Sequence, residues 1–409
     1  MKTLTRWCMA GAVACLGFAG AYAEAAIELT AVPGGVSVRQ EGRVSGADAA
    51  RIACARGEYE SFQVVVTARG TNLRDIQAEI SELRSEAGDA LPREAVTLYR
   101  EVFVPVRHSA PRAALPPGLV PDPLVPFINP YTGEPVPEPR WRGDEREGPR
   151  FGAAGFEVWQ DRHQPLWVDV YVPVDAAPGT YTGMFRVRSV DGPSAELPIE
   201  VTVWDFALPA GPTHENHFGG FGPVASYHGL KVDSEEYRIL EDRYAAMLAA
   251  HRLNPPLPHG LRPTIAEDGT AEFPEDLDRR ITEFVDRYHV TNIDVPRAPF
   301  NDVLGADREK ALRYYRSWYA FLERKGWAER AYLYMLDEPN TPGQYEEVRQ
   351  LGALVREAEP RRIAASGERP IGGQRQRASA ARGGPRSMAR PERIRQPRRH
   401  RRHSPRAAA

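Results

Sequence analysis

The stretch LWVDVYV at residues 166–172 decides how the first half of the chain folds. Large apolar residues occupy every second position in it, which is the pattern of a β-strand with one face in a core. The same alternation recurs in FQVVVT at 62–67, FRVR at 185–188 and IEVTVW at 199–204, and turn residues such as APG at 177–179 separate these runs. We therefore predict an antiparallel β-sandwich over residues 24–211.

One segment inside that range departs from the pattern. Residues 105–149 contain twelve prolines and few periodic positions. A loop of that length usually carries function or docks on a neighbouring domain. Phe127, Tyr131 and Trp141 favour a docked loop, because disordered segments are poor in aromatic residues; a disordered spacer is the alternative.

From residue 212 the apolar period changes from two to that of helices. Asp233-Ser234-Glu235-Glu236 and Thr341-Pro342 are helix-start signals, and Lys325-Gly326 is a helix-end signal. The four expected helices have the apolar faces Tyr237/Leu240/Tyr244/Met247, Ile281/Phe284/Val285/Tyr288, Leu312/Tyr315/Tyr319/Leu322 and Tyr345/Val348/Leu351/Val355. Short apolar runs at 217–221, 291–295 and 331–336 alternate with them, with a possible further strand near Leu253. Alternating strands and helices predict a parallel sheet, here a partial (β/α)8 TIM-type barrel over residues 212–360.

The two ends of the chain differ from this body. Residues 361–409 hold fifteen arginines against two glutamates, a net charge of +13, whereas residues 1–360 carry −15. An acidic body is not expected to bind nucleic acid through a broad basic face. The segment 361–409 has no aromatic residue, and we expect a disordered tail, read out of frame in a GC-rich gene; a basic tail that binds RNA or membrane is the alternative.

Residues 1–23 have the features of an export signal. Lys2 and Arg6 precede an apolar stretch from Trp7 to Ala19, and Ala21-Tyr22-Ala23 fits a cleavage site. Thirteen apolar residues are too few to span a bilayer, and no later segment qualifies as a transmembrane helix. We expect export to the periplasm or the exterior; lipidation at Cys15 is the alternative.

The sharpest chemical feature is YLYMLDEP at residues 332–339, where an apolar strand leads into Asp337 and Glu338. In a β/α barrel this pair would lie at the carboxyl ends of the strands, where such enzymes keep their active sites. The pKa values of two carboxyl groups at one site tend to split, so that one group keeps its proton and the other is ionised. Glycoside hydrolysis uses such an acid and base. The structural alternative, that one of them caps the next helix, is weakened because Thr341 already fills that role.

Four motifs together resemble glycoside hydrolase family 123 over most of residues 27–360. They are EYESFQVVV at 58–66, PGTYTG at 178–183, VWDFALP at 203–209 and DEP at 337–339. The resemblance implies a β-sandwich followed by a (β/α)8-type catalytic barrel. It also implies a retaining, exo-acting β-N-acetylgalactosaminidase whose substrate is a glycan with a terminal N-acetylhexosamine.

The same resemblance implies substrate-assisted catalysis without a metal or other cofactor. The 2-acetamido oxygen of the sugar would attack the anomeric carbon. Asp337 would orient the acetamido group, while Glu338 would protonate the leaving oxygen and then activate water. Other candidates for substrate binding at the barrel mouth are Tyr334, Asp294, His217 and Arg297, although a structural role for Asp294 is an equal alternative.

The chain departs from that family in length. A full barrel needs about 250 residues, whereas residues 214–360 number only 147. The sequence therefore suggests an exported glycosidase whose barrel is truncated and inactive in this chain. The alternative is a carbohydrate- or protein-binding sandwich with a degenerate catalytic part. Nothing in the sequence indicates an oligomeric state.

Overall fold

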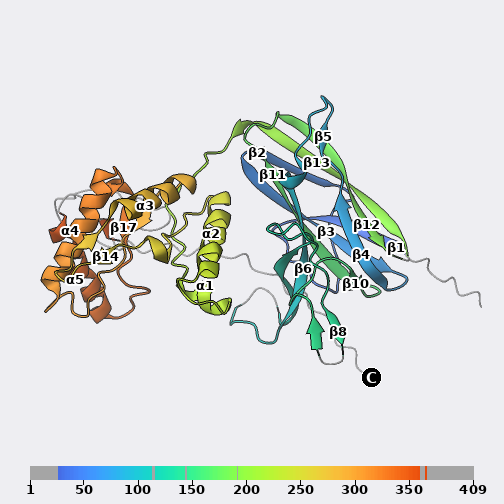
Figure 1. Ribbon diagram of the computed structural model, residues 1–409. Helices are drawn as coiled ribbons and strands as arrows, with labels where there is room; N and C mark the ends of the chain where they lie inside the picture. Colours follow the sequence, from blue (N-terminus) through green and yellow to red (C-terminus); the bar gives the residue numbers. More distant parts are fainter. Residues whose placement is uncertain (1–25, 113–115, 143–144, 191, 360–363, 366–409) are drawn as a thin grey trace, which may run out of the picture.

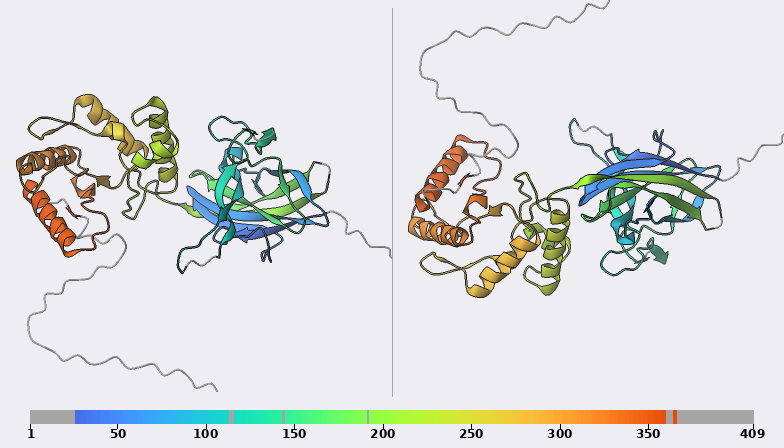
Figure 2. Two further views of the ribbon diagram at one scale, coloured as in Figure 1. Left: turned by 90° about the horizontal axis from the view of Figure 1, so that it is seen from below. Right: turned by 90° about the horizontal axis from the view of Figure 1, so that it is seen from above.

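The computed structural model describes residues 26–112, 116–142, 145–190, 192–359 and 364–365. The expected export signal and nearly all of the Arg-rich segment lie outside the described residues. The rest forms two lobes, a β-sandwich and a helical lobe, joined through residues 208–221 (Figures 1 and 2).

The sandwich lobe consists of two facing sheets. The first sheet has the order β1-β3-β11-β6-β7, with β1 at Ala26–Pro33, β3 at Glu58–Arg69, β11 at His163–Val172, β6 at Val96–Val106 and β7 at Gly118–Pro126. The second has the order β10-β4-β12-β13-β2, with β10 at Phe156–Val158, β4 at Leu73–Ile80, β12 at Gly179–Ser189, β13 at Ser194–Ala207 and β2 at Ala50–Arg56. Smaller elements are β5 at Arg84–Ser85, which pairs with β12, the hairpin of β8 at Arg140–Arg142 and β9 at Glu145–Glu147, and a 3₁₀ turn at Arg93–Ala95.

The residues that alternate in the sequence form the core between these sheets. Phe62, Val64, Val168, Phe185 and Ile199 are all at most 3% exposed and belong to one apolar cluster. A fully buried side chain of this size stabilises a fold by about 1.5–3 kcal/mol. The sandwich predicted from the period of two is therefore present.

One pairing differs from an antiparallel sandwich. β2 runs parallel to β13, with Ile199 opposite Ala50 and Val203 opposite Cys54. β2 is an edge strand, and Gly57, at φ +75°, turns the chain from it directly into β3 of the other sheet. Because the chain leaves β2 for the other sheet, β2 forms no hairpin with its neighbour β13 and can run parallel to it.

The proline-rich segment is partly ordered. Its residues Gly118–Pro126 form β7, paired antiparallel with β6 at the edge of the first sheet. An edge strand tolerates proline because the backbone N–H groups on its outer side have no strand to pair with. The high proline content therefore did not indicate a strand in the sequence. Tyr131 lies 3.9 Å below the guanidinium of Arg243 in the helical lobe, so the loop after β7 is docked.

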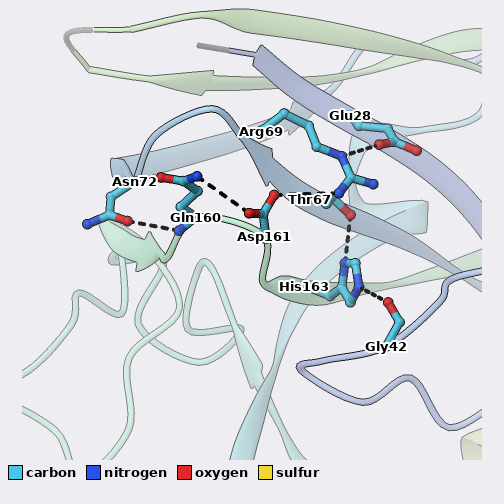
Figure 3. A network of polar contacts seen from close by, with 8 residues as sticks. All are labelled: Glu28, Gly42, Thr67, Arg69, Asn72, Gln160, Asp161 and His163. Atoms are coloured by element: carbon cyan, nitrogen blue, oxygen red, sulfur yellow. Dashed lines mark hydrogen bonds and ion pairs between the residues drawn. The ribbon is translucent and has the colours of Figure 1, made fainter. Parts of the chain in front are cut away.

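A buried histidine ties the first sheet to the loop after β1 (Figure 3). His163 is 4% exposed; its Nε2 lies 2.9 Å from the carbonyl of Gly42 and its Nδ1 lies 2.8 Å from Oγ1 of Thr67. A carbonyl only accepts, so Nε2 carries the proton and Nδ1 accepts from Thr67. Both ring nitrogens are satisfied, which gives this histidine a structural role.

The helical lobe contains the four expected helices and one short one. Their bounds are α1 at Gly222–Tyr227, α2 at Glu235–Ala250, α3 at Glu275–Arg287, α4 at Arg308–Arg324 and α5 at Pro342–Ala358. The minor elements are β14 at Thr264–Ile265, paired with β15 at Ala271–Glu272, and 3₁₀ turns at His259–Leu261 and Ala328–Arg330. Thr341 with Gln344 forms a complete capping box on α5, as the sequence predicts. Ser234 caps α2, one residue after Asp233, the cap that a glutamate at the third helical position would require.

The buried face of α2 differs from the expected one. Tyr237, Glu241, Ala245 and Leu248 are buried, whereas Met247 is 45% exposed. Glu241 can enter the interior because its carboxylate accepts a hydrogen bond from the backbone N–H of His259 at 3.2 Å. A buried, satisfied carboxylate cannot be recognised from the apolar period alone.

The parallel sheet of this lobe is short. β16 at Ile293–Asp294, β17 at Ala331–Leu333 and β18 at Ala364–Ala365 pair in parallel in that order. β18 lies beyond residue 360, where we placed the end of the barrel. Residues 217–221 and the region of Leu253, expected as strands, are irregular in this structure. The described residues therefore form part of a β/α barrel. No helix among them is both long and apolar enough to cross a membrane.

Candidate active site

Asp337 and Glu338 follow β17 at a bend of the backbone, and both are exposed. Glu338 has φ +42°, a left-handed conformation uncommon for a residue with a side chain. This turn interrupts the alternation of the strand, which would otherwise send adjacent side chains to opposite faces.

Tyr334 interacts with both carboxylates. Its hydroxyl donates to Oδ1 of Asp337 at 2.6 Å. That hydrogen bond raises the pKa of Tyr334, with smaller contributions from burial and from the negative charges of Asp337 and Glu338. Both charges thus act on the same phenol.

His217, which lies in the segment before α1, also contacts this group. Its ring stacks on Tyr334, with centroids 5.1 Å apart and an angle of 16° between the planes, and its Nδ1 is hydrogen-bonded to the hydroxyl of Tyr332. Burial lowers the pKa of His217, so its imidazole is neutral at neutral pH. Tyr332 and Tyr334 lie on the strand face opposite Leu333 and Met335, which pack against the helices.

Asp294 lies beside this group, at the end of the neighbouring strand. It is in register with Tyr332, is half-buried, and borders a cavity of about 10 Å³ together with His217 and Tyr332. That volume holds about one water molecule. Burial raises the pKa of Asp294 to about 6, although a hydrogen bond from the backbone of Tyr334 and the charge of Arg262 oppose the shift.

Arg297 is not part of the same group. Its guanidinium lies 3.8 Å from the carboxylate of Glu347 on α5, and it borders a separate cavity of about 190 Å³ with Met335 and Leu351. Met335 faces the helices, so Arg297 lies on the helix side of the sheet. The structure brings together Asp337, Glu338, Tyr334, His217 and Asp294, and it places Arg297 elsewhere.

Asn254 and Asn292, which the sequence did not indicate, position this site together with Asn216. The side chain of Asn254 donates to the carbonyl of Asn292 at 2.7 Å and accepts from the backbone N–H of Thr291 at 2.8 Å. Asn292 donates to the carbonyl of Asn216, and Asn216 accepts from the backbone N–H of Asn254, both at 2.7 Å. These amides replace strand pairing between the segments that carry His217 and Asp294. Their regular spacing, 38 residues in each step, was the available signal.

The described residues contain no group of three or more histidine, cysteine, aspartate or glutamate side chains placed to hold a metal ion. The arrangement at the end of β17 offers two exposed carboxylates, a phenol and an aromatic pair. Such a set can accept and donate protons and can contact a flat, hydroxylated ligand.

No known protein-family model and no curated protein matches this sequence. Among solved structures, the chain is similar to a family 123 glycoside hydrolase from Clostridium perfringens, described in connection with glycolipid glycan hydrolysis. The TM-score is 0.50 and the identity 13%, over 81% of this chain and 60% of that one. Weaker similarities include a Bacteroides ovatus GH5 xyloglucanase (TM-score 0.22, 6% identity, 75% of this chain and 60% of that one) and AvmM, a macrocyclization catalyst of alchivemycin A biosynthesis (0.25, 12%, 45% and 92%).

The first of these similarities shows a glycosidase-like fold, a sandwich followed by part of a barrel. The chain spans about 60% of the length of that hydrolase. At 13% identity the likeness concerns the fold and not the chemistry of the site.

Proposed function

We propose that this chain belongs to an exported glycoside hydrolase that acts on N-acetylhexosaminides, with a terminal N-acetyl-β-galactosaminide as the expected substrate. The observation that carries this proposal is the hydrogen bond between Tyr334 and Asp337 beside Glu338, at the carboxyl end of a parallel strand. Active sites of β/α barrels lie at that end of the sheet. The similar fold of a family 123 hydrolase supports the proposal.

In this proposal the two carboxylates have different tasks. The Tyr334 hydroxyl fixes the orientation of Asp337, which then holds the 2-acetamido group while the acetamido oxygen attacks the anomeric carbon. A negative charge there stabilises the positive charge that develops on the cyclic intermediate. Glu338 gives its proton to the leaving oxygen and afterwards takes one from the water that attacks the anomeric carbon and releases the acetamido oxygen. Each of the two displacements inverts the anomeric carbon, so its configuration is retained overall.

The neighbouring side chains are suited to hold a sugar. The stacked rings of His217 and Tyr334 provide an aromatic surface next to Asp337. Asp294, half-buried on the same side, offers a carboxylate to a sugar hydroxyl. We propose His217, Tyr334 and Asp294 as substrate-binding residues; Arg297 needs a side-chain rearrangement to join them, because it pairs with Glu347.

The test compares three aryl glycosides: an N-acetyl-β-galactosaminide, its N-trifluoroacetyl analogue and the β-galactoside that lacks the acetamido group. If the acetamido oxygen takes part in the reaction, the N-acetyl-β-galactosaminide should be hydrolysed, the N-trifluoroacetyl analogue should be hydrolysed much more slowly, and the β-galactoside should not be hydrolysed. Asp337→Asn and Glu338→Gln should abolish or strongly slow the reaction, while Glu346→Gln serves as the matched control, because Glu346 is exposed on α5 and its partners are Arg349 and Gln350.

Because the described part of the barrel has three short strands, we expect turnover by this chain to be slow or absent, and binding of the sugar-derived thiazoline, a mimic of the cyclic intermediate, gives a second readout. Hydrolysis of the β-galactoside at a rate equal to that of the N-acetylated sugar would contradict the mechanism. Absence of both turnover and thiazoline binding would favour the alternative, a sandwich that binds carbohydrate or protein beside a degenerate catalytic part.

A further inference from the structure

The outer face of the first sheet carries aromatic side chains around one carboxylate. Phe62, Val168 and Val170 point into the core, so the residues between them point outward. The strand register places Tyr59 opposite Tyr171, Ser61 opposite Asp169 and Tyr99 opposite Trp167. We call this set, Tyr59, Ser61, Tyr99, Trp167, Asp169 and Tyr171, the aromatic face.

Asp169 lies in the middle of the aromatic face and is held in place. Its Oδ1 accepts from the hydroxyl of Ser61 and from the indole N–H of Trp167, both at 2.6 Å. Within the part of the chain that the structure describes, no hydrogen bond ends on Oδ2. The carboxylate therefore keeps a free acceptor oxygen between two aromatic pairs.

The two aromatic pairs are far enough apart for more than a single small group. Four residues of extended strand separate Trp167 from Tyr171, which corresponds to about 13 Å. The rings of Tyr59 and Tyr171 lie 4.8 Å apart at an angle of 38°. All six side chains of the aromatic face are only half-buried, so they remain partly open to solvent.

A groove continues from the aromatic face towards the edge of the sandwich. It has a volume of about 700 Å³ and is bordered by residues 59–62 and Trp167 together with residues 31–35, 47 and 49–53. A Cβ atom on Gly34 would lie 3.1 Å from the ring of Trp167 and 3.2 Å from the carbonyl of Ser61, so only glycine fits there without a shift. The chain is thus closely fitted around the indole while the groove beside it stays open.

Other residues cover the two ends of the outer face of the first sheet. Val32, Val38 and Val65 form a small separate core, in which the loop after β1 packs on the sheet. At the opposite end His251 of the helical lobe stacks on Tyr59, with centroids 5.1 Å apart. The aromatic face is therefore the open stretch between that loop and the junction of the lobes.

We propose that the aromatic face binds a neutral oligosaccharide. A sugar ring has apolar C–H faces and polar hydroxyl edges, and the aromatic face offers flat rings for the former and the Oδ2 of Asp169 for the latter. The negative charge of Asp169 in the middle of the aromatic face disfavours uronic or sulfated chains. The inference does not depend on the proposed hydrolysis, because all of its residues belong to the sandwich.

The test is calorimetric titration of the intact chain with chitotetraose, cellotetraose and tetragalacturonic acid. We expect saturable binding of at least one neutral tetramer and none of the acidic one. Trp167→Ala and Asp169→Asn should each weaken that binding at least about tenfold, equivalent to about 1.4 kcal/mol. Trp204→Ala is the matched control, since Trp204 is 44% exposed on the second sheet and should leave the affinity unchanged.

Three results would overturn the proposal: no saturable binding of either neutral tetramer, equal affinities of the Trp167→Ala and Trp204→Ala variants, or preference for the acidic tetramer. If Trp167→Ala proves unfolded by circular dichroism, Asp169→Asn decides, because its Oδ1 can still accept from Ser61 and Trp167 while Nδ2 replaces the free acceptor. Binding that is lost in Asp337→Asn and kept in Asp169→Asn would assign the sugar to the other lobe and also count against the aromatic face.

Discussion

At the scale of single residues, the arrangement around Tyr334 determines what the carboxylate pair can do. A hydroxyl that donates to Asp337 fixes one carboxylate, while the left-handed backbone at Glu338 redirects the other. Asp337 and Glu338 then differ in surroundings although they are neighbours in sequence. Separate tasks for two carboxylates require such a difference.

The acid role of Glu338 predicts a dependence on the leaving group. Glu338→Gln should slow hydrolysis of alkyl N-acetyl-β-galactosaminides by about 10²–10⁴-fold, because a poor leaving group needs the proton. Activated aryl glycosides should lose much less, whereas Asp337→Asn should slow both classes. The measurement is kcat/KM across a series of leaving groups, and equal losses for Glu338→Gln across that series would argue against the assignment.

A second residue-scale prediction concerns Glu101 on β6. Its side chain is 6% exposed, and among the described residues its Oε1 has no hydrogen-bond partner. Burial raises the pKa of Glu101 to about 7. The folded protein therefore binds a proton that the unfolded chain releases, and stability falls as pH rises from about 4.5 to about 7.

Glu101→Gln should accordingly raise the free energy of unfolding at pH 8 by about 1–3 kcal/mol. The gain should shrink through the window between pH 7 and pH 4.5 and vanish below it. Urea unfolding at several pH values measures the difference, with the exposed Glu79→Gln as the control. A gain that is independent of pH would show that burial of the ionised carboxylate is not its cause.

At the scale of elements, side-chain amides hold together segments that a complete sheet would join by backbone pairing. Residues 216–217 and 254 are irregular, yet Asn216, Asn254 and Asn292 connect them to β16. Asn254 is 3% exposed, so its hydrogen bonds are shielded from water. The position of His217 relative to Asp294 depends on this ladder.

Asn254→Ala should therefore lower the free energy of unfolding of the helical lobe by at least about 2 kcal/mol, because buried backbone groups lose their partners. It should also reduce sugar binding at the carboxylate pair, since His217 is no longer fixed. Thr341→Ala, which removes the cap of α5, should cost only about 1 kcal/mol. Thermal unfolding followed by circular dichroism compares the two, and an effect of Asn254→Ala no larger than that of Thr341→Ala would refute the role of the ladder.

At the scale of the whole molecule, the described residues form two large hydrophobic cores, besides the small cluster of Val32, Val38 and Val65. One lies between the sheets of the sandwich, and the other lies among α2 to α5 and β16 to β17. Among the described residues, the polar and aromatic contacts between the lobes are local: Arg252 donates to the carbonyls of Gly57 and Pro209, His251 stacks on Tyr59, and Arg243 lies over Tyr131. Lobes joined in this way unfold as separate units.

Residues 24–211 should consequently express as a soluble domain with one cooperative unfolding transition. In the intact chain, limited proteolysis should cut first beyond about Gly211, because the parallel sheet of the helical lobe has three short strands and open edges within the described residues. Mass spectrometry of the surviving fragments and calorimetry of both forms test this. Survival of residues 212–359 after the sandwich has been digested would contradict it.

The sequence by itself determined the local features of this protein. The period of two at 62–67 and 166–172 specified the buried faces of β3 and β11, because alternation in an extended chain is local geometry. The motif at 233–236 specified the start of α2 to within one residue, and Thr341 specified where α5 begins. The position of Asp337 and Glu338 shortly after a strand could also be predicted, since apolar runs and turns are local patterns, although the strand ends at Leu333 and not at residue 336.

Only the tertiary structure decided the features that depend on which segments meet. The parallel pairing of β2 with β13, the edge position that lets β7 contain proline, and the burial of Glu241 beneath His259 all require knowledge of a distant partner. The same holds for the site, where β17 separates Arg297 from Tyr334 although both follow apolar strands. Register and packing combine residues far apart in the chain, and no local pattern encodes which of them will face one another.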